Sequence, residues 1–272
     1  MWQYTDKGTI NGIGTSSEPA YFDMNYTYLK PTNNQTSSNK IDLSSSSVSE
    51  ISSKTYTGSA IEPSFTVTLN NKILKENEDY TVTYSNNISI GTAKILIKGT
   101  GNYTGEKTIT FKIIPKKISK VSLSKKTTNS LTLSWNKLDD VTGYKIYKYD
   151  SKSEDYEYLK TIKGASTTSF TDSNLTDATV YKYKVRGYKT VDGNAYNGFI
   201  SNSFAESTKV KTVSNLNLKT RNATSLELSW DKVKNADGYR IYRLDTNTDT
   251  YKLVKTINNN TTTSYKHSNL VS

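Results

Sequence analysis

One stretch of this sequence occurs twice, and it limits the folds that the chain can adopt. The first copy reads Leu131-Thr-Leu-Ser-Trp135 and then Gly143-Tyr-Lys-Ile-Tyr147; the second reads Leu226-Glu-Leu-Ser-Trp230 and then Gly238-Tyr-Arg-Ile-Tyr242. Every matched pair is 95 residues apart, so the two copies align without insertion or deletion. Within each copy apolar and polar residues alternate, which is typical of β-strands with one buried face. The repeat length fits a seven-stranded β-sandwich of roughly 100 residues.

The residue types that are missing argue against several kinds of chemistry. The 272 residues contain no cysteine and a single histidine, His267. Disulfides, zinc sites built from cysteine or histidine, thiol catalysis and histidine general-base catalysis are therefore not expected. Asp245-Thr-Asn-Thr-Asp249 begins like a calcium-binding loop, but Thr250 and Thr256 occupy the positions that need glycine and glutamate. This segment is predicted to be an ordinary inter-strand loop, and we expect no cofactor and no metal ion.

The chain is strongly basic, with a formal charge of +11. Only four of its 36 basic residues are arginine: Arg186, Arg221, Arg240 and Arg243. Because bidentate recognition of phosphates and bases favours arginine, and because the lysines are spread along the chain, nucleic acid is not an expected partner. The charge favours instead a weak attraction to anionic polymers such as those of a bacterial cell wall. No apolar run approaches the roughly 18 residues of a membrane span, so no membrane span is expected.

Residues 1–30 contain short phrases that resemble a known enzyme family. Trp2-Gln-Tyr4 and Asp23-Met-Asn25 look like the last segment of glycoside hydrolase family 25 muramidases, the lysozymes that cleave peptidoglycan on a barrel-like α/β scaffold. The resemblance implies a C-terminal remnant of such a barrel, with Asp23 matching a late acidic residue near the catalytic site. Glycoside hydrolysis needs two carboxyl groups about 5–10 Å apart. The family's main catalytic acids would lie upstream of Met1, and so would a signal peptide. We therefore expect this chain to be a fragment that is inactive by itself. Alternatively, Asp23 is a turn residue that caps its own backbone.

The next two segments are a linker and a first sandwich. Residues 31–40 are polar and begin with proline, which is typical of a linker. Between residues 41 and 115 apolar residues recur at every second position, in short runs bounded by Asn and Gly turns, which indicates an antiparallel sandwich. The phrases Asp79-Tyr-Thr-Val82 and Gly101-Asn-Tyr-Thr-Gly105 resemble a bacterial Ig-like repeat of Gram-positive surface proteins.

The repeated segments resemble fibronectin type III modules. In residues 116–210 an early Trp135 is followed by Leu175 and, six residues later, by Tyr181. The resemblance implies that Tyr181 is a corner tyrosine whose hydroxyl bonds to the backbone a few residues upstream. Residues 211–272 hold the second copy without counterparts of Tyr181 and the residues after it. We expect this truncated module to be marginally stable and prone to associate, since it would expose apolar surface and unpaired strand edges.

Three tyrosines are candidates for surface contact. Tyr147, Tyr149 and Tyr242 are predicted to lie on the strand face opposite Tyr144 and Tyr239. A row of exposed rings with lysines nearby would stack on sugars. The alternative is that these rings cover the sheet or pack against a neighbouring module.

These patterns predict an all-β chain of tandem antiparallel β-sandwiches, Ig-like and fibronectin type III, joined by short linkers and preceded by a remnant of an α/β barrel. We expect the sandwiches to be spacer and wall-contact modules of a secreted, peptidoglycan-cleaving, lysozyme-like bacterial protein, located outside the cell at the wall. The expected partner is peptidoglycan or an anionic wall polymer. An adhesin stalk and an array of carbohydrate-binding modules are the alternatives.

Overall fold

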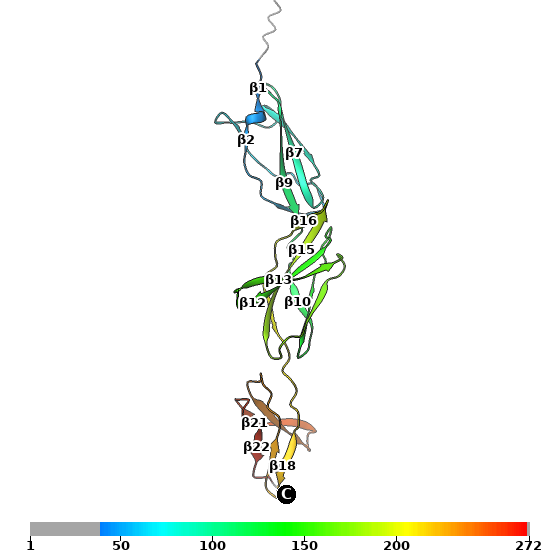
Figure 1. Ribbon diagram of the computed structural model, residues 1–272, viewed down its shortest axis with the longest axis vertical. Helices are drawn as coiled ribbons and strands as arrows, with labels where there is room; N and C mark the ends of the chain where they lie inside the picture. Colours follow the sequence, from blue (N-terminus) through cyan, green and yellow to red (C-terminus); the bar gives the residue numbers. More distant parts are fainter. Residues whose placement is uncertain (1–38, 271–272) are drawn as a thin grey trace, which may run out of the picture. The chain divides into compact units, whose positions relative to one another are not determined.

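The computed structural model describes residues 39–270, and the chain divides into two units, Met1–Lys40 and Ile41–Ser272. The second unit contains three β-sandwiches, some of whose strands are labelled in Figure 1. Apart from one short 3₁₀-helix, η1 (Leu43–Ser45), the regular structure of the described residues is entirely strand. The predicted architecture of tandem β-sandwiches is confirmed. Asp23, the predicted barrel remnant and residues 31–38 of the predicted linker lie outside the described residues.

The first sandwich contains strands β1 to β9. They are β1 (Ile41–Asp42), β2 (Ser47–Val48), β3 (Lys54–Thr55), β4 (Val67–Leu69), β5 (Lys72–Ile73), β6 (Tyr80–Ser85), β7 (Gly91–Gly99), β8 (Tyr103–Thr104) and β9 (Glu106–Ile114). The main sheet has the order β3-β9-β7-β6, and a second has the order β2-β4-β5. Along β7, every second residue is buried in the core (Ala93, Ile95 and Ile97), as the period of two predicts. Two short pairings, β1 with β8 and β3 with β9, run parallel, whereas the other pairings between the described strands are antiparallel.

The second sandwich contains strands β10 to β17. They are β10 (Val121–Lys126), β11 (Ser130–Trp135), β12 (Gly143–Asp150), β13 (Asp155–Lys163), β14 (Ser169–Ser173), β15 (Val180–Val191), β16 (Asn194–Asn197) and β17 (Phe204–Ser207). One sheet has the order β10-β11-β14; the other has the order β13-β12-β15-β16, with β17 also paired to β15. Leu131, Leu133 and Trp135 of β11 face the core between the sheets. Asp192 and Gly193, both with positive φ, form the two-residue turn between β15 and β16.

The third sandwich contains strands β18 to β22. They are β18 (Asn217–Arg221), β19 (Leu226–Ser229), β20 (Tyr239–Asp245), β21 (Thr250–Ile257) and β22 (Ser264–His267). One sheet has the order β18-β19-β22, and the other contains only β20 and β21. Asp245 pairs with Thr250 across the β20–β21 turn, so the segment that begins like a calcium loop is the tip of a hairpin.

The sequence repeat is also a repeat of side-chain geometry. The rings of Trp135 and Tyr144 meet edge to face with centroids 5.3 Å apart, and those of Trp230 and Tyr239 do so at 5.2 Å. The hydroxyl of Tyr144 accepts a hydrogen bond from the backbone N–H of Leu138 at 3.0 Å. The hydroxyl of Tyr239 accepts the corresponding bond from the backbone N–H of Val233, also at 3.0 Å. Each tyrosine thereby fixes the segment that leads from one sheet to the other.

The glycine before each of these tyrosines is also explained by the packing. A Cβ atom at Gly143 would collide with the carbonyl oxygen of Ile162 on the neighbouring strand, and one at Gly238 would collide with that of Ile257. Only glycine allows the two backbones to approach so closely. The glycine of each repeated Gly-Tyr pair is therefore required by the close approach of the two neighbouring strands.

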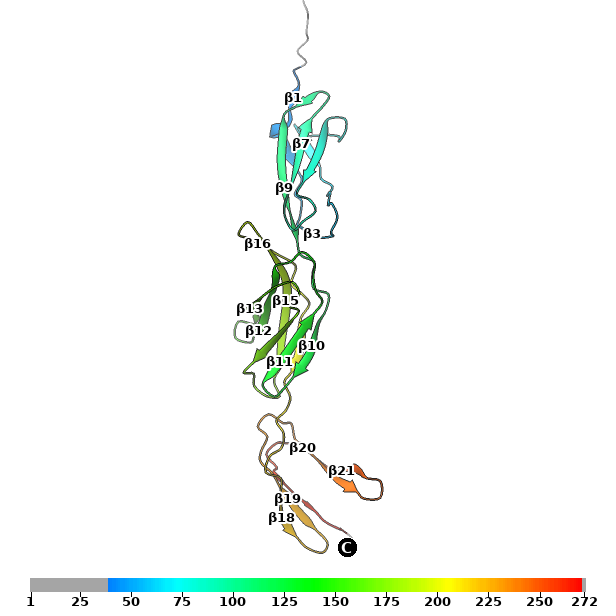
Figure 2. The same ribbon diagram turned by 90° about the vertical axis from the view of Figure 1, so that its right-hand side faces the viewer.

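The third sandwich differs from the second in how many strands pair with its β20–β21 hairpin and in how much apolar surface stays exposed. In the second sandwich β12 pairs with β13 on one side and with β15 on the other, whereas β20 pairs in the described residues only with β21. Figure 2 shows the β20–β21 hairpin diverging from β18 and β19 toward its turn. Several apolar side chains on this hairpin remain exposed, and Tyr251 is 72% exposed. The buried hydrophobic core of this sandwich is correspondingly small and consists of Trp230, Val233 and Tyr239.

Candidate functional site

The outer face of the second sandwich gathers tyrosines and basic side chains. Because neighbouring residues on a strand point to opposite faces, the burial of Tyr144 and Ile146 turns Tyr147 and Tyr149 outward. The same alternation on β15, where Tyr183 is buried, turns the basic residues between the core positions outward. We name the resulting surface the tyrosine–cation face. It consists of Tyr147, Tyr149, Tyr156, Tyr158, Lys182, Lys184 and Arg186.

The four tyrosines form two cross-strand pairs. In the register of β12 with β13, Tyr147 lies opposite Tyr158 and Tyr149 lies opposite Tyr156. The ring centroids are 6.2 Å apart in the first pair and 5.4 Å in the second, with the rings edge to face in both. Such pairs contribute about 0.5–1.5 kcal/mol beyond the area they bury. The rings are therefore held in place as a row before any ligand arrives.

Each of the three cations lies over a tyrosine ring. The Nζ atom of Lys184 is 4.1 Å from the ring centroid of Tyr156, and that of Lys182 is 4.9 Å from the centroid of Tyr149. The guanidinium carbon of Arg186 is 5.0 Å from the ring centroid of Tyr147, and this guanidinium also donates to the Tyr147 hydroxyl. An aromatic surface beneath a cation restricts the long side chain while leaving its N–H donors accessible.

The face carries positive charge without an acidic partner. Within residues 39–270, Lys182, Lys184 and Arg186 form no ion pair, and the Nε atom of Arg186 has no hydrogen-bond acceptor although it is buried. Tyr158 is 59% exposed at the edge of the row. An anionic group would therefore meet fixed donors, and a sugar ring beside it would meet an aromatic surface.

The structure brings together two of the three tyrosines singled out from the sequence. Tyr147 and Tyr149 lie on the same strand and belong to the tyrosine–cation face. Tyr242 lies on β20 of the third sandwich, where it is opposite Leu253 and 49% exposed. The contact role of all three tyrosines stays a prediction, and Asp23 lies outside the described residues.

Sequence reasoning missed five members of the face. Tyr156 and Tyr158 alternate along β13, and the three basic residues alternate along β15, so the signal of an outward row is present in the sequence. A β-bulge between Ile146 and Tyr147 sets which tyrosines lie opposite each other. That register cannot be read from either strand alone.

A charged cluster lies between this sheet and the β10-β11-β14 sheet. The carboxylate of Asp172 accepts a hydrogen bond from the Tyr183 hydroxyl at 2.7 Å and forms an ion pair with Lys148 at 2.9 Å. Burial raises the pKa of the Tyr183 phenol, and its hydrogen bond to Asp172 raises this pKa further. The phenol therefore stays protonated and acts as a fixed donor. Among the described residues, no group of three or more His, Asp or Glu side chains is placed to hold a metal ion.

Comparison with known families agrees with the geometry of the second sandwich. The family model of the fibronectin type III domain matches residues 116–198. This segment is a fibronectin type III domain. All seven members of the tyrosine–cation face lie inside it. The resemblances to a muramidase and to a bacterial Ig-like repeat concern residues outside the matched segment and stay predictions.

Two solved structures of fibronectin type III domains align with parts of this chain. A segment of two such domains from chicken tenascin aligns with a TM-score of 0.40 and 20% identity, covering 57% of this chain and 83% of that structure. The FN1–FN3 domains of chicken CNTN1 align with a TM-score of 0.32 and 17% identity, covering 68% of this chain and 69% of that structure. A search of the curated proteins found no match. None of the helices in residues 39–270 has the length and apolar character needed to cross a membrane.

Proposed function

We propose that this chain is an array of β-sandwich modules from an extracellular bacterial protein, and that its fibronectin type III domain contacts an anionic polymer of the cell wall. The observation that carries the proposal is the tyrosine–cation face, where three cations lie over tyrosine rings without an acidic partner. A polymer of sugars with phosphate or carboxylate groups presents both features that such a face recognises. The overall charge of +11 adds a long-range attraction to such a polymer.

The remaining modules act in this proposal as spacers. The muramidase resemblance of residues 1–30, which includes Asp23, makes a peptidoglycan-cleaving enzyme the proposed parent. A wall-binding module joined to such an enzyme would raise the concentration of the catalytic domain at its substrate. The chain itself contributes binding and spacing to this arrangement, not the cleavage.

The test is a sedimentation assay with purified cell walls, before and after chemical removal of their anionic polymers. The variant Lys184→Gln/Arg186→Gln removes two charges from the face. The control variant Lys94→Gln/Lys125→Gln removes the same net charge from exposed positions on β7 and β10. The proposal predicts that the face variant binds at least about tenfold more weakly than the wild type, while the control variant changes binding by less than about threefold.

Two results would contradict the proposal. Equal loss in both variants would mean that net charge alone drives the binding. Unchanged binding to walls stripped of anionic polymer would mean that the face does not recognise that polymer. Binding should also weaken as salt rises from about 50 to 500 mM, because the contacts are ionic and partly exposed.

A further inference from the structure

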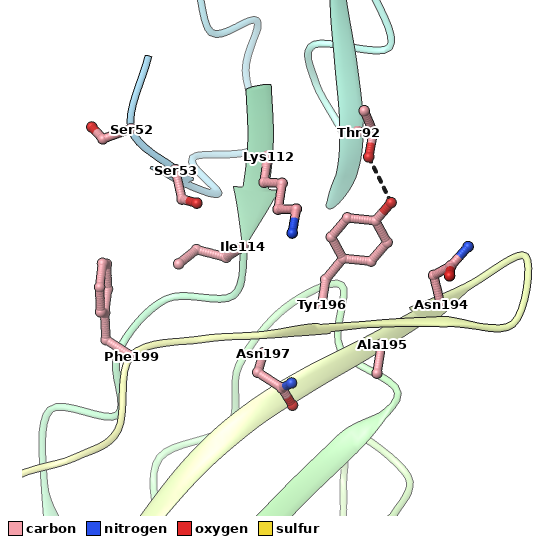
Figure 3. A pocket seen from close by; sticks show the side chains of 10 residues that line it. All are labelled: Ser52, Ser53, Thr92, Lys112, Ile114, Asn194, Ala195, Tyr196, Asn197 and Phe199. Atoms are coloured by element: carbon pink, nitrogen blue, oxygen red, sulfur yellow. Dashed lines mark hydrogen bonds between the residues drawn. The ribbon is translucent and has the colours of Figure 1, made fainter. Parts of the chain in front are cut away.

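A cleft lies where the first and second sandwiches meet, and none of its lining residues belongs to the tyrosine–cation face. Its volume is about 870 Å³, within the range of about 300–1,000 Å³ typical of ligand pockets, which often form at domain interfaces. Figure 3 shows its lining, in which Ser53, Lys112 and Ile114 come from the first sandwich and Tyr196 and Phe199 from the second. Both sandwiches are therefore needed to form the site.

The walls of the cleft are fixed by contacts between the two sandwiches. The hydroxyls of Thr92 and Tyr196 are 2.7 Å apart at the edge of the cleft, as the dashed line in Figure 3 marks. The backbone N–H of Ile90 donates to the carboxylate of Asp140 at 3.2 Å, and the same carboxylate pairs with Lys189 at 2.5 Å. These bonds join loops and strands far apart in the sequence, so the cleft is formed before a ligand binds.

The cleft offers an unpaired cation beside aromatic surface. In Figure 3 the side chains of Lys112 and Ile114 extend into the space between Tyr196 and Phe199. The Lys112 side chain is exposed and, within the described residues, forms no ion pair and no hydrogen bond, and no acidic residue lines the cleft. The Phe199 side chain is 57% exposed, so its ring is accessible to a ligand in the cleft.

The other lining groups are neutral and polar. They are the hydroxyls of Ser52 and Ser53 and the amides of Asn194 and Asn197. The amide oxygen of Asn197 is buried without a hydrogen-bond partner in the described chain. Hydroxyls and amides both donate and accept, so together they match a ligand rich in hydroxyl groups better than a purely ionic one.

We propose that this cleft binds a short acidic oligosaccharide. The aromatic rings of Tyr196 and Phe199 contact the apolar faces of the sugar rings, the amides and serines bond to hydroxyls, and Lys112 pairs with a carboxylate of the sugar. A ligand held in this way contacts both sandwiches at once. Binding therefore stabilises the joint between them as well as the ligand complex.

The experiment is a titration of the full chain with a tetrasaccharide of galacturonic acid, followed by calorimetry and by amide chemical shifts. A neutral tetrasaccharide of galactose and a peptide of four glutamates are the comparison ligands. The proposal predicts that the acidic sugar binds most tightly, and that Lys112→Gln and Phe199→Ala each weaken its binding on the order of tenfold. Lys94→Gln, on β7 outside the cleft, is the matched control for charge and should leave the binding unchanged.

The outcomes separate this site from the tyrosine–cation face. The variant Lys184→Gln/Arg186→Gln should bind the acidic tetrasaccharide at the cleft as well as the wild type does, because none of its changes touches the lining. Loss of binding in that variant, together with normal binding by Lys112→Gln, would overturn the assignment of the cleft as the binding site while leaving the proposed function intact. Tighter binding of the glutamate peptide than of the sugar would overturn the assignment of the ligand. Amide spectra of each variant show whether it has folded.

Discussion

The phenol oxygen of Tyr181 lies 2.9 Å from the backbone nitrogen of Thr176, and the N–H of Thr176 donates to it. This is the corner contact that the resemblance to fibronectin type III modules implies for Tyr181. It closes the turn by which the chain leaves β14 and enters β15. Since β15 carries three members of the tyrosine–cation face, the corner also sets the start of the strand that positions the cations.

Replacing Tyr181 by phenylalanine should destabilise the second sandwich by about 1 kcal/mol, because the hydrogen bond is lost while the ring is kept. Hydrogen exchange of the slowest amides in β12 and β15 measures this change. The control is Tyr158→Phe, whose hydroxyl bonds to Thr161 at an exposed edge and whose loss should cost less than about 0.5 kcal/mol. Equal effects of the two variants would contradict a special role for the corner.

Asp172→Asn should cost more, about 2 kcal/mol. The substitution leaves Lys148 without its ion-pair partner and weakens the acceptor of the Tyr183 hydroxyl. Urea unfolding compares this variant with Asp192→Asn, which changes an exposed turn residue and should alter stability by less than about 0.5 kcal/mol. An unchanged free energy of unfolding in the Asp172→Asn variant would show that the buried cluster does not stabilise the sandwich.

The stability of the second sandwich should depend on pH through Glu206. Its carboxylate accepts a hydrogen bond from Lys126 at 3.0 Å, joining β17 to β10, and this bond lowers the pKa of Glu206 from its ordinary value of 4.5. A carboxyl whose pKa is lower in the folded state stabilises the fold above its unfolded pKa. That stabilisation is lost as the pH falls through the folded pKa.

The variant Glu206→Gln tests this dependence by thermal unfolding at pH 7 and at roughly pH 3. We expect the variant to melt below the wild type at pH 7, and the gap between them to narrow at the lower pH. A gap that stays constant with pH would mean that the pKa of Glu206 is the same in the folded and unfolded states.

The third sandwich should open more readily than the second. Its buried hydrophobic residues are few, and Tyr251 of the β20–β21 hairpin is largely exposed. Amides in residues 225–270 should therefore exchange faster than those in residues 130–190, and the chain should associate as its concentration rises. Equal protection in the two segments would contradict this expectation.

The sequence predicts the parts of the fold that depend on local pattern. The repeat places Trp135 and Tyr144 in the core, and their counterparts Trp230 and Tyr239 adopt the same edge-to-face geometry. Alternation along β12 places Tyr147 on the outer face. The two-residue strands β1, β3 and β8, which form the parallel pairings, are too short to show any period and were not predicted.

The candidate site was predictable only in part, because it depends on contacts between strands. The cation over Tyr156 comes from Lys184, and their proximity depends on the pairing of β12 with both β13 and β15. The cluster of Asp172 and Lys148 could not be inferred from the repeat either, because the corresponding residues in the third sandwich are His267 and Arg243. The cleft between the sandwiches depends on how two modules pack, which no local pattern encodes.

The most direct test of the wall-contact proposal is an NMR titration of the full chain with a soluble anionic wall polymer. The account predicts that the largest amide shifts fall on β12, β13 and β15 around Tyr149, Tyr156 and Lys184, and that they disappear in Lys184→Gln/Arg186→Gln. Shifts of equal size around exposed lysines throughout the described chain, unchanged in that variant, would contradict it.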